Sequence, residues 1–153
     1  MTRVFSIRLF RLSDLPRILE IECSSFGKDA YDRNLFAYFH HKCGDLFLVA
    51  VKGRNVCGYG VSCKGGGVRS GRAELVSIAV DPRYRGKGIA SQLLESTIRR
   101  LRRRGVVRLH LMVKVTNDTA IRFYERHGFQ KGRIVRGYYE DGSDGRGMSK
   151  PLV

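Results

Sequence analysis

Hydrophobic and polar residues follow two different periods along the chain, and each period predicts its own kind of element. Between Val107 and Val115 every second residue is apolar and branched, which indicates a strand with one fully apolar face. Shorter apolar runs bounded by turn residues predict six further strands. These lie near residues 4–10, 46–51, 56–63, 73–80, 130–139 and 146–152.

A helical period predicts four helices between these strands. The clearest covers residues 88–104, because apolar residues recur at every third or fourth position before Gly105. We expect Ser13 and Asp14 to cap a first helix that buries Leu15, Ile18, Leu19 and Cys23 on one face. A loop at residues 24–31 precedes a second, short helix marked by Leu35, Phe36 and Phe39, and Asn117 caps a fourth from Asp118 to His127, ended by Gly128.

This mixture of strands and helices, with antiparallel hairpins, predicts an α/β (α+β) domain with a central mixed sheet. The chain has 153 residues and is 42% hydrophobic, which is enough for a core without metal or disulfides. We therefore expect one domain over residues 1–153.

The stretch from Val80 to Ser91 joins a strand to the helix at 88–104 through a basic, glycine-containing turn. Gly86 and Gly88 allow successive backbone N–H groups to point into one concavity at a helix N-terminus, which favours an anion such as phosphate. Gly88 stands where a P-loop needs Ser or Thr, so a nucleotide triphosphatase is excluded. Ser91 and the lack of an acid on the next strand exclude a dinucleotide fold. A second glycine-rich segment, 65–71, is predicted to be a surface loop.

The chain carries 29 Lys and Arg against 14 Asp and Glu, a net charge of +15. A coenzyme with a few phosphates does not account for so much charge, so contact with RNA, a ribosome or an acidic protein stays open beside a general basic bias. Five arginines lie between residues 99 and 104, more than a helix C-terminus needs. They indicate either an anionic partner or a solvated face.

The cysteines and histidines give no metal signature. Cys23, Cys43, Cys57 and Cys63 form no C-x-x-C pair, and with no apolar run of membrane-spanning length we expect a cytoplasmic protein with reduced cysteines and no metal site. We also expect a monomer or a weak homodimer that does not bind membranes.

Two motifs resemble the GNAT superfamily of N-acetyltransferases. The first is Arg85-x-x-Gly88-x-Ala90, and the second is the run from Asn117 to Phe129. Within the superfamily, Gly137-Tyr138-Tyr139 before an acidic loop is similar to the RimI-like ribosomal-protein alanine acetyltransferases and their archaeal relatives. The resemblance implies a twisted, mostly antiparallel sheet of six or seven strands flanked by about four helices. It also implies acetyl-CoA as donor and a protein or peptide N-terminus as acceptor.

Carried over by position, the resemblance assigns roles to individual residues. The backbone of Ile78, Ala79 and Val80 would contact the pantetheine arm, and Asn117 would bind near the thioester. Tyr124 would protonate the departing thiolate. Tyr138 and Tyr139, with Tyr31 from the aromatic loop between the first two helices, would bind the acceptor. The pyrophosphate would be held by Arg85, Gly86, Lys87, Gly88, Ile89, Ala90 and Ser91.

The general base departs from the family pattern. Many RimI-like enzymes have Glu where this chain has Met112, which cannot accept a proton. Glu74, at the place where lysine-acetylating members keep their catalytic Glu, is the first candidate, and His110, on the Met112 face of its strand, is the second.

The amine favoured as acceptor is a protein α-amine. Its pKa lies near 8, whereas a lysine amine needs about 3 kcal/mol more to lose its proton. A lysine or small-amine acetyltransferase stays as an alternative, although a basic enzyme repels polyamines. The alternative from another class is a basic RNA- or ribosome-binding module with a vestigial coenzyme site.

Overall fold

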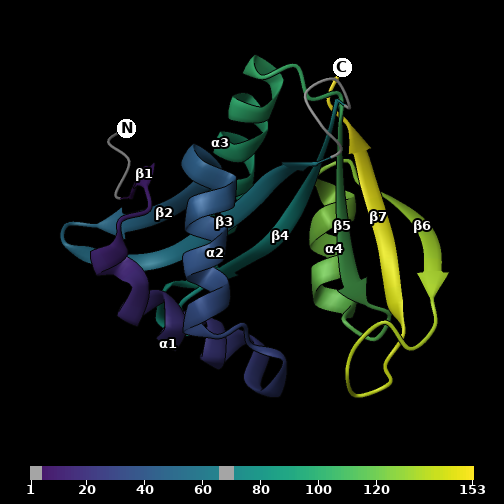
Figure 1. Ribbon diagram of the computed structural model, residues 1–153, viewed down its shortest axis with the longest axis horizontal. Helices are drawn as coiled ribbons and strands as arrows, with labels where there is room; N and C mark the ends of the chain where they lie inside the picture. The colour runs from purple at the N-terminus through teal and green to yellow at the C-terminus, as the bar shows by residue number, and fades with distance from the viewer. Residues whose placement is uncertain (1–4, 66–70) are drawn as a thin grey trace.

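The computed structural model describes residues 5–65 and 71–153, so most of the predicted glycine loop at 65–71 lies outside the described residues. In these ranges the chain forms a seven-stranded sheet with the order β1-β2-β3-β4-β5-β7-β6 (Figure 1). The strands are β1 (Ser6–Leu9), β2 (Phe47–Lys52), β3 (Asn55–Gly65), β4 (Arg72–Val80), β5 (Arg108–Lys114), β6 (Gln130–Val135) and β7 (Gly145–Pro151). The predicted mixed sheet is confirmed.

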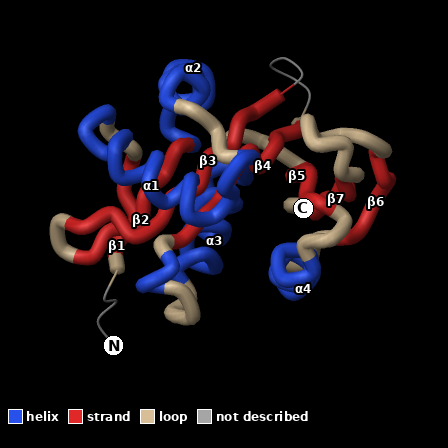
Figure 2. Tube along the Cα trace, turned by 90° about the horizontal axis from the view of Figure 1, so that it is seen from below, coloured by secondary structure: helices blue, strands red, loops and turns tan. Residues whose placement is uncertain are grey.

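Four helices cover the two faces of the sheet. They are α1 (Leu15–Phe26), α2 (Arg33–Cys43), α3 (Ile89–Arg103) and α4 (Asp118–Arg126). Helices α1 and α2 lie on one face and α3 and α4 on the other (Figure 2). The alternation of β2 explains both layers, because Val49 packs with α1 and α2 while its neighbours Leu48 and Ala50 pack with α3.

The sheet is divided between β4 and β5, its parallel pair. These strands pair only over Arg72–Glu74 and 108–110, after which they separate. In β4 the register against β3 passes from Leu75 to Ser77, so Val76 is an extra residue at a β-bulge. The bulge lets the side chains of Val76 and Ser77 both reach the α1–α2 side. From residue 75 onward β4 therefore presents a backbone edge that no strand of the described chain covers on the β5 side.

Helix ends follow the predicted signals in three places. Gly105 and Gly128 follow α3 and α4 with φ of 77° and 89°, the left-handed conformation of a C-terminal glycine. At the start of α4, Asn117 accepts a hydrogen bond from the backbone N–H of Ala120 at 3.2 Å. These three predictions are confirmed.

The first helix differs from its prediction. It continues to Phe26, followed by a 3₁₀ turn at Gly27–Asp29, where we expected a loop at 24–31. Cys23 is exposed, and Ile21 and Glu22 take the buried positions instead. Asp14 does not cap the helix with its side chain, because its carboxylate binds the guanidinium of Arg8 and the backbone N–H of Arg11.

The expectation of reduced cysteines is wrong for two of the four. Cys43, at the end of α2, forms a disulfide with Cys63 of β3, and their Cα atoms lie 4.7 Å apart. The sequence spacing of 20 residues carried no sign of this proximity, which arises because α2 packs across β3. Within residues 5–65 and 71–153 we find no group of three or more potential metal ligands. None of the helices there could cross a membrane.

Candidate active site

A cavity of about 1090 Å³ occupies the opening between β4 and β5. One wall is the β4 segment 75–78 and the other is the β5 segment 111–114. Further lining residues come from α1 and α2 on one face of the sheet and from α4 on the other. The cavity is therefore lined from both faces of the sheet, and two different molecules that approach from these faces could meet inside it.

Glu22 is the most buried acid of this cavity, with 1% of its surface exposed. Its carboxylate accepts hydrogen bonds from the backbone N–H of Tyr31 at 2.9 Å and from the hydroxyls of Tyr59 and Ser77. Burial raises the pKa of Glu22, and the three donors only partly oppose that effect. A carboxylate in this setting accepts a proton more readily than an ordinary Glu, which suits a general base.

Glu22 is not among the site residues predicted from the sequence. A signal was present, because Ile18 and Glu22 lie four residues apart and therefore on one face of the helix. A carboxylate at a buried helical position needs donors, and here they come from residues 31, 59 and 77. Their proximity is a property of the fold and not of any local motif.

Tyr124 and Asn117 line the same cavity from the α4 side. Tyr124 is buried against Phe123 and Phe129, and burial raises the pKa of its phenol well above the ordinary value. The phenol therefore keeps its proton at all physiological pH values. Asn117 is at once the helix cap and a lining residue, so the structural and the functional interpretations of this position are compatible.

The turn before α3 has the backbone shape that its glycines predict. Gly86 and Gly88 have φ of 78° and 79°, and both face open space, so conformation and not crowding selects glycine there. Gly88 is the N-cap residue of α3, and no side chain caps this helix start. The first N–H groups of a 15-residue helix are thus available to an anion, as a coenzyme pyrophosphate requires.

The cations of this turn are partly committed to protein groups. Asp81 is buried, and the guanidinium groups of Arg17 and Arg83 hold its pKa well below the usual range. Arg85 donates to the carbonyl of Val80 at 3.2 Å and to the Ser25 hydroxyl at 3.2 Å. In this arrangement Arg85 fastens the turn to β4 and α1, and its direct contact with a coenzyme stays a prediction.

Ser91 and His127 connect the two helices of the α3–α4 face. The ring Nδ1 of His127 lies 2.8 Å from the carbonyl of Phe123, and since a carbonyl only accepts, Nδ1 carries the proton. Nε2 is then the acceptor for the Ser91 hydroxyl at 3.0 Å. The predicted pyrophosphate turn is in this way fixed to the end of α4.

Tyr31, Tyr138 and Tyr139, which were predicted to bind the acceptor, all line the cavity on its α1–α2 side, and their contact with an acceptor stays a prediction. The last two lie in the loop between β6 and β7, not in a strand reaching residue 139 as expected. Their rings meet edge to face with centroids 5.0 Å apart, and burial raises the pKa of Tyr139 to about 12. Lys114 pairs with Asp29 at 2.7 Å and Asp141 at 3.0 Å, which joins the two walls of this entrance.

The two predicted bases, Glu74 and His110, lie side by side in the short β4–β5 ladder, outside the cavity lining. Desolvation raises the pKa of Glu74, and its charge raises the pKa of Tyr138. Nε2 of His110 accepts from the Arg72 guanidinium at 3.3 Å, and burial together with Arg72 and Arg108 lowers its pKa. Met112 lines the cavity directly. A role for Glu74 or His110 as base stays a prediction.

The split sheet, the uncapped glycine turn and a cavity lined by both Glu22 and Tyr124 fit a transferase site for two substrates. The model of the Acetyltransferase (GNAT) family matches residues 15–129, and the chain belongs to this family. It is an acyltransferase whose donor is acetyl-CoA.

Three relatives illustrate the similarity. An N-alpha-acetyltransferase of Saccharolobus solfataricus is 33% identical over 98% of this chain and 95% of its own length. The crystal structure of Ard1 from Thermoplasma volcanium superposes with a TM-score of 0.92 at 28% identity, covering 99% of each chain. The ribosomal-protein-S18-alanine N-acetyltransferase of Escherichia coli gives a TM-score of 0.81 at 29% identity over 97% of this chain and 94% of that one.

Proposed function

We propose that this enzyme transfers an acetyl group to the α-amine of protein N-termini. The observation that carries the proposal is the cavity between β4 and β5, which is lined by Tyr124 on one face of the sheet and by Glu22 and an aromatic entrance on the other. The names of the relatives from Saccharolobus solfataricus and Escherichia coli support the same acceptor.

The donor side fits acetyl-CoA through backbone groups. The uncovered edge of β4 at Ile78, Ala79 and Val80 would hold the pantetheine arm as an added strand. Residues 85–91 would hold the pyrophosphate, and Asn117 would bind the arm near its end. When bound, acetyl-CoA supplies an acetyl group activated as a thioester.

Proton transfer is assigned to two groups on opposite sides of the cavity. Glu22 takes the proton of the acceptor ammonium at its carboxylate, directly or through water, because its raised pKa brings it closer to that of the amine. Tyr124, whose hydroxyl burial keeps protonated, would give its proton to the coenzyme thiolate that leaves when the amine takes the acetyl group. Glu74 and His110 act at most at the rim of this route, since neither lines the cavity.

The acceptor is an α-amine because the pKa of an α-amine is lower than that of a lysine amine. At neutral pH an α-amine is partly neutral, whereas a lysine amine needs about 3 kcal/mol more to be deprotonated. The entrance also suits an extended chain, since Tyr31 and Tyr138 offer flat side chains from two different loops. We place the enzyme in the cytoplasm, where nascent N-termini arise, as a monomer or weak homodimer.

The test is an acetylation assay with matched peptides. A short peptide with a free N-terminus and no lysine should be acetylated, and the same peptide blocked at its N-terminus but carrying one lysine should react far more slowly. Mass spectrometry of the products identifies the modified nitrogen. Faster turnover of the blocked lysine peptide would replace the proposal with a lysine acetyltransferase.

A further inference from the structure

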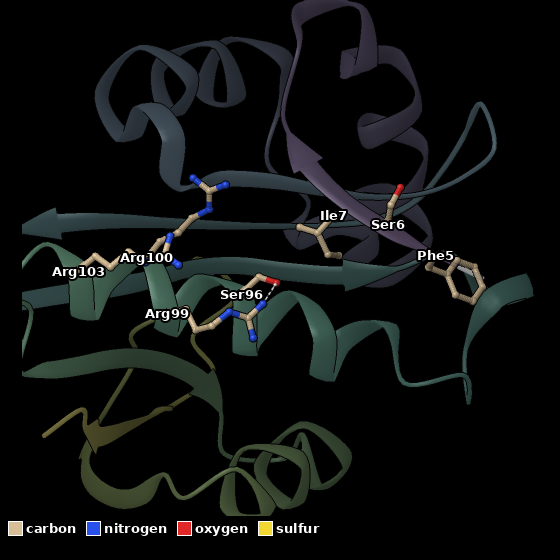
Figure 3. Close-up of a pocket in the computed structure, with 7 residues that line it drawn as sticks. All are labelled: Phe5, Ser6, Ile7, Ser96, Arg99, Arg100 and Arg103. Carbon is tan, nitrogen blue, oxygen red and sulfur yellow. Dashed lines mark hydrogen bonds between the residues drawn. The ribbon is translucent and has the colours of Figure 1, made fainter. Parts of the chain in front are cut away.

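A second, smaller cavity of about 470 Å³ lies on the α3 side of the sheet, between β1 and the C-terminal half of α3 (Figure 3). It shares no lining residue with the active-site cavity. Figure 3 shows that its basic side chains all project from α3, beside the strand that carries Ser6 and Ile7. We call it the arginine groove, and it is lined by Phe5, Ser6, Ile7, Ser96, Arg99, Arg100 and Arg103.

The five arginines of residues 99–104 divide into two sets. Arg102 donates to the carbonyl of Leu152 at 2.8 Å, and Arg104 pairs with Asp45. These two stabilise the fold. The other three all line the arginine groove, and in the described part of the chain none of them forms an ion pair.

The three groove arginines are unfavourable to the isolated helix. Residues 99 and 103 are four apart and residues 100 and 103 are three apart, so like charges lie next to one another on the same face. Each such pair costs about 0.2 to 0.5 kcal/mol. A helix C-terminus gains from a cation in its last turn, but one or two suffice, and Arg102 already occupies that position.

The composition of the groove favours a nucleic acid over a protein. Its apolar members, Phe5 and Ile7, are buried or half-buried, while the accessible groups are guanidinium and hydroxyl donors. Protein interfaces need an apolar centre depleted of charge, whereas nucleic-acid interfaces are polar and strongly positive. Among the groove residues, Arg99 contacts only the Ser96 hydroxyl, at 3.0 Å, and guanidinium forks bind phosphate in pairs of hydrogen bonds.

We infer that the arginine groove binds the phosphodiester backbone of RNA. The choice of RNA rests on the proposed function, since protein N-termini first become available at the ribosome, whose surface is rich in RNA. The groove lies on the sheet face opposite α1 and α2, so RNA bound there leaves the acceptor entrance accessible. Part of the +15 net charge then serves to hold the enzyme near its substrates.

The experiment measures binding of a labelled RNA hairpin by fluorescence anisotropy over a series of salt concentrations. The test variant is Arg99→Gln/Arg100→Gln/Arg103→Gln. The control variant, Lys131→Gln/Arg133→Gln/Arg136→Gln, removes the same charge at the opposite edge of the sheet, on and just after the exposed strand β6. Losing three phosphate contacts should make the negative slope of log affinity against log salt concentration shallower by about 2 to 3. The same loss should weaken binding about a hundredfold near 0.1 M salt. The control variant should bind RNA less than about tenfold more weakly than the wild type at the same salt concentration.

Acetylation of a free peptide without RNA is measured in parallel, and the test variant should keep wild-type kcat and KM. If neither the wild type nor any variant acetylates the peptide, but RNA binding still depends on the groove arginines, the proposed function is wrong and the arginine groove remains an RNA-binding site. Equal losses of RNA affinity in both triple variants would overturn the groove as a site. Polyglutamate competing as well as RNA at equal charge would overturn it in favour of an acidic protein, and tighter binding of duplex DNA would overturn RNA as the ligand.

Discussion

The substitution Glu22→Gln tests whether the carboxylate of Glu22 is catalytic or only structural. The substitution keeps the shape of the side chain and one carbonyl oxygen, which can still accept from Tyr59 and Ser77. It removes the group that accepts a proton. Positioned general bases contribute about 10²- to 10⁴-fold to rate, and because an α-amine is partly neutral already, we expect the lower end, a fall in kcat of about 10²-fold or about 2.7 kcal/mol.

The stability of the same variant should depend on pH in a defined direction. Burial raises the pKa of Glu22 in the folded state above its value of 4.5, so the folded protein holds this proton more tightly than the unfolded chain does. The wild type is therefore favoured below pH 4.5 and loses stability as the pH rises through the folded pKa. Gln cannot titrate, so the wild type should lose stability relative to Glu22→Gln over this range. In the variant, the side-chain NH₂ group of the new Gln cannot accept the hydrogen bond of the Tyr31 N–H, which lowers the variant's unfolding free energy by about 1 to 3 kcal/mol at every pH.

The assay follows thiol release from acetyl-CoA with a free N-terminal peptide between pH 5 and 9, together with thermal unfolding across the same range. The wild type should keep its kcat/KM as the pH falls below about 8 until Glu22 takes up its proton, because Glu22 deprotonates the ammonium form of the acceptor. The variant can use only the neutral amine, so its kcat/KM should fall about tenfold per pH unit below the amine pKa of about 8. Glu20→Gln is the matched control, since Glu20 is two residues away and 69% exposed, and within the described residues its carboxylate forms an ion pair only with Arg17. A variant with kcat within about threefold of the wild type and an unchanged acid limb would refute the assignment.

Three further predictions concern the other parts of the site and its support. Tyr124→Phe should lower kcat about 10²-fold or more with little change in the KM for peptide, whereas Tyr38→Phe, at a half-exposed lining position, should not; equal effects would argue against a proton donor at Tyr124. Gly88→Ala forces a side chain into φ of 79° at a cost of about 1 to 2 kcal/mol, so it should lower the unfolding temperature and raise the KM for acetyl-CoA; an unchanged KM would place the pyrophosphate elsewhere. Reduction of the Cys43–Cys63 disulfide opens the loop that this bond closes over a sequence separation of 20, so it should cost about 3 kcal/mol of unfolding free energy, measured with denaturant. A double Ser variant should lose the same amount whether or not reductant is present.

The elements that sequence reasoning located well are those whose signals are local. The alternation of β5 and the apolar face of α3 each specify an element without reference to the rest of the chain. The same is true of Gly86 and Gly88, because a left-handed backbone position selects glycine wherever it occurs. These features were enough to predict β5, α3 and the glycine turn between β4 and α3, while the role of that turn in binding the coenzyme stays a prediction.

The α1–α2 side of the cavity could not be predicted in the same way, because it is built from contacts between distant segments. Glu22 gains its environment from residues 31, 59 and 77, and Cys43 meets Cys63 only after α2 has packed on β3. Tyr138 and Tyr139 were identified, but their loop was assigned to a strand, since aromatic residues favour strands in general. A base was sought near Met112 on the central strands, and the most buried acid of the cavity is on a helix instead.

The short ladder between β4 and β5, which we call the joint, connects two groups of strands. Four strands lie on one side of it and three on the other, and strand pairing connects the two groups at only three positions of each strand. A shared hydrophobic core and the Lys114–Asp29 ion pair also join them. Glu22 and the edge of β4 belong to the first group, while Tyr124 and Asn117 belong to the second. Small rotations about this joint would alter the separation of Glu22 and Tyr124, the two groups proposed to transfer protons, without changing either one. Substitutions at Ala73 or Leu109, which lie in this ladder and outside the cavity lining, would therefore test whether turnover depends on that separation.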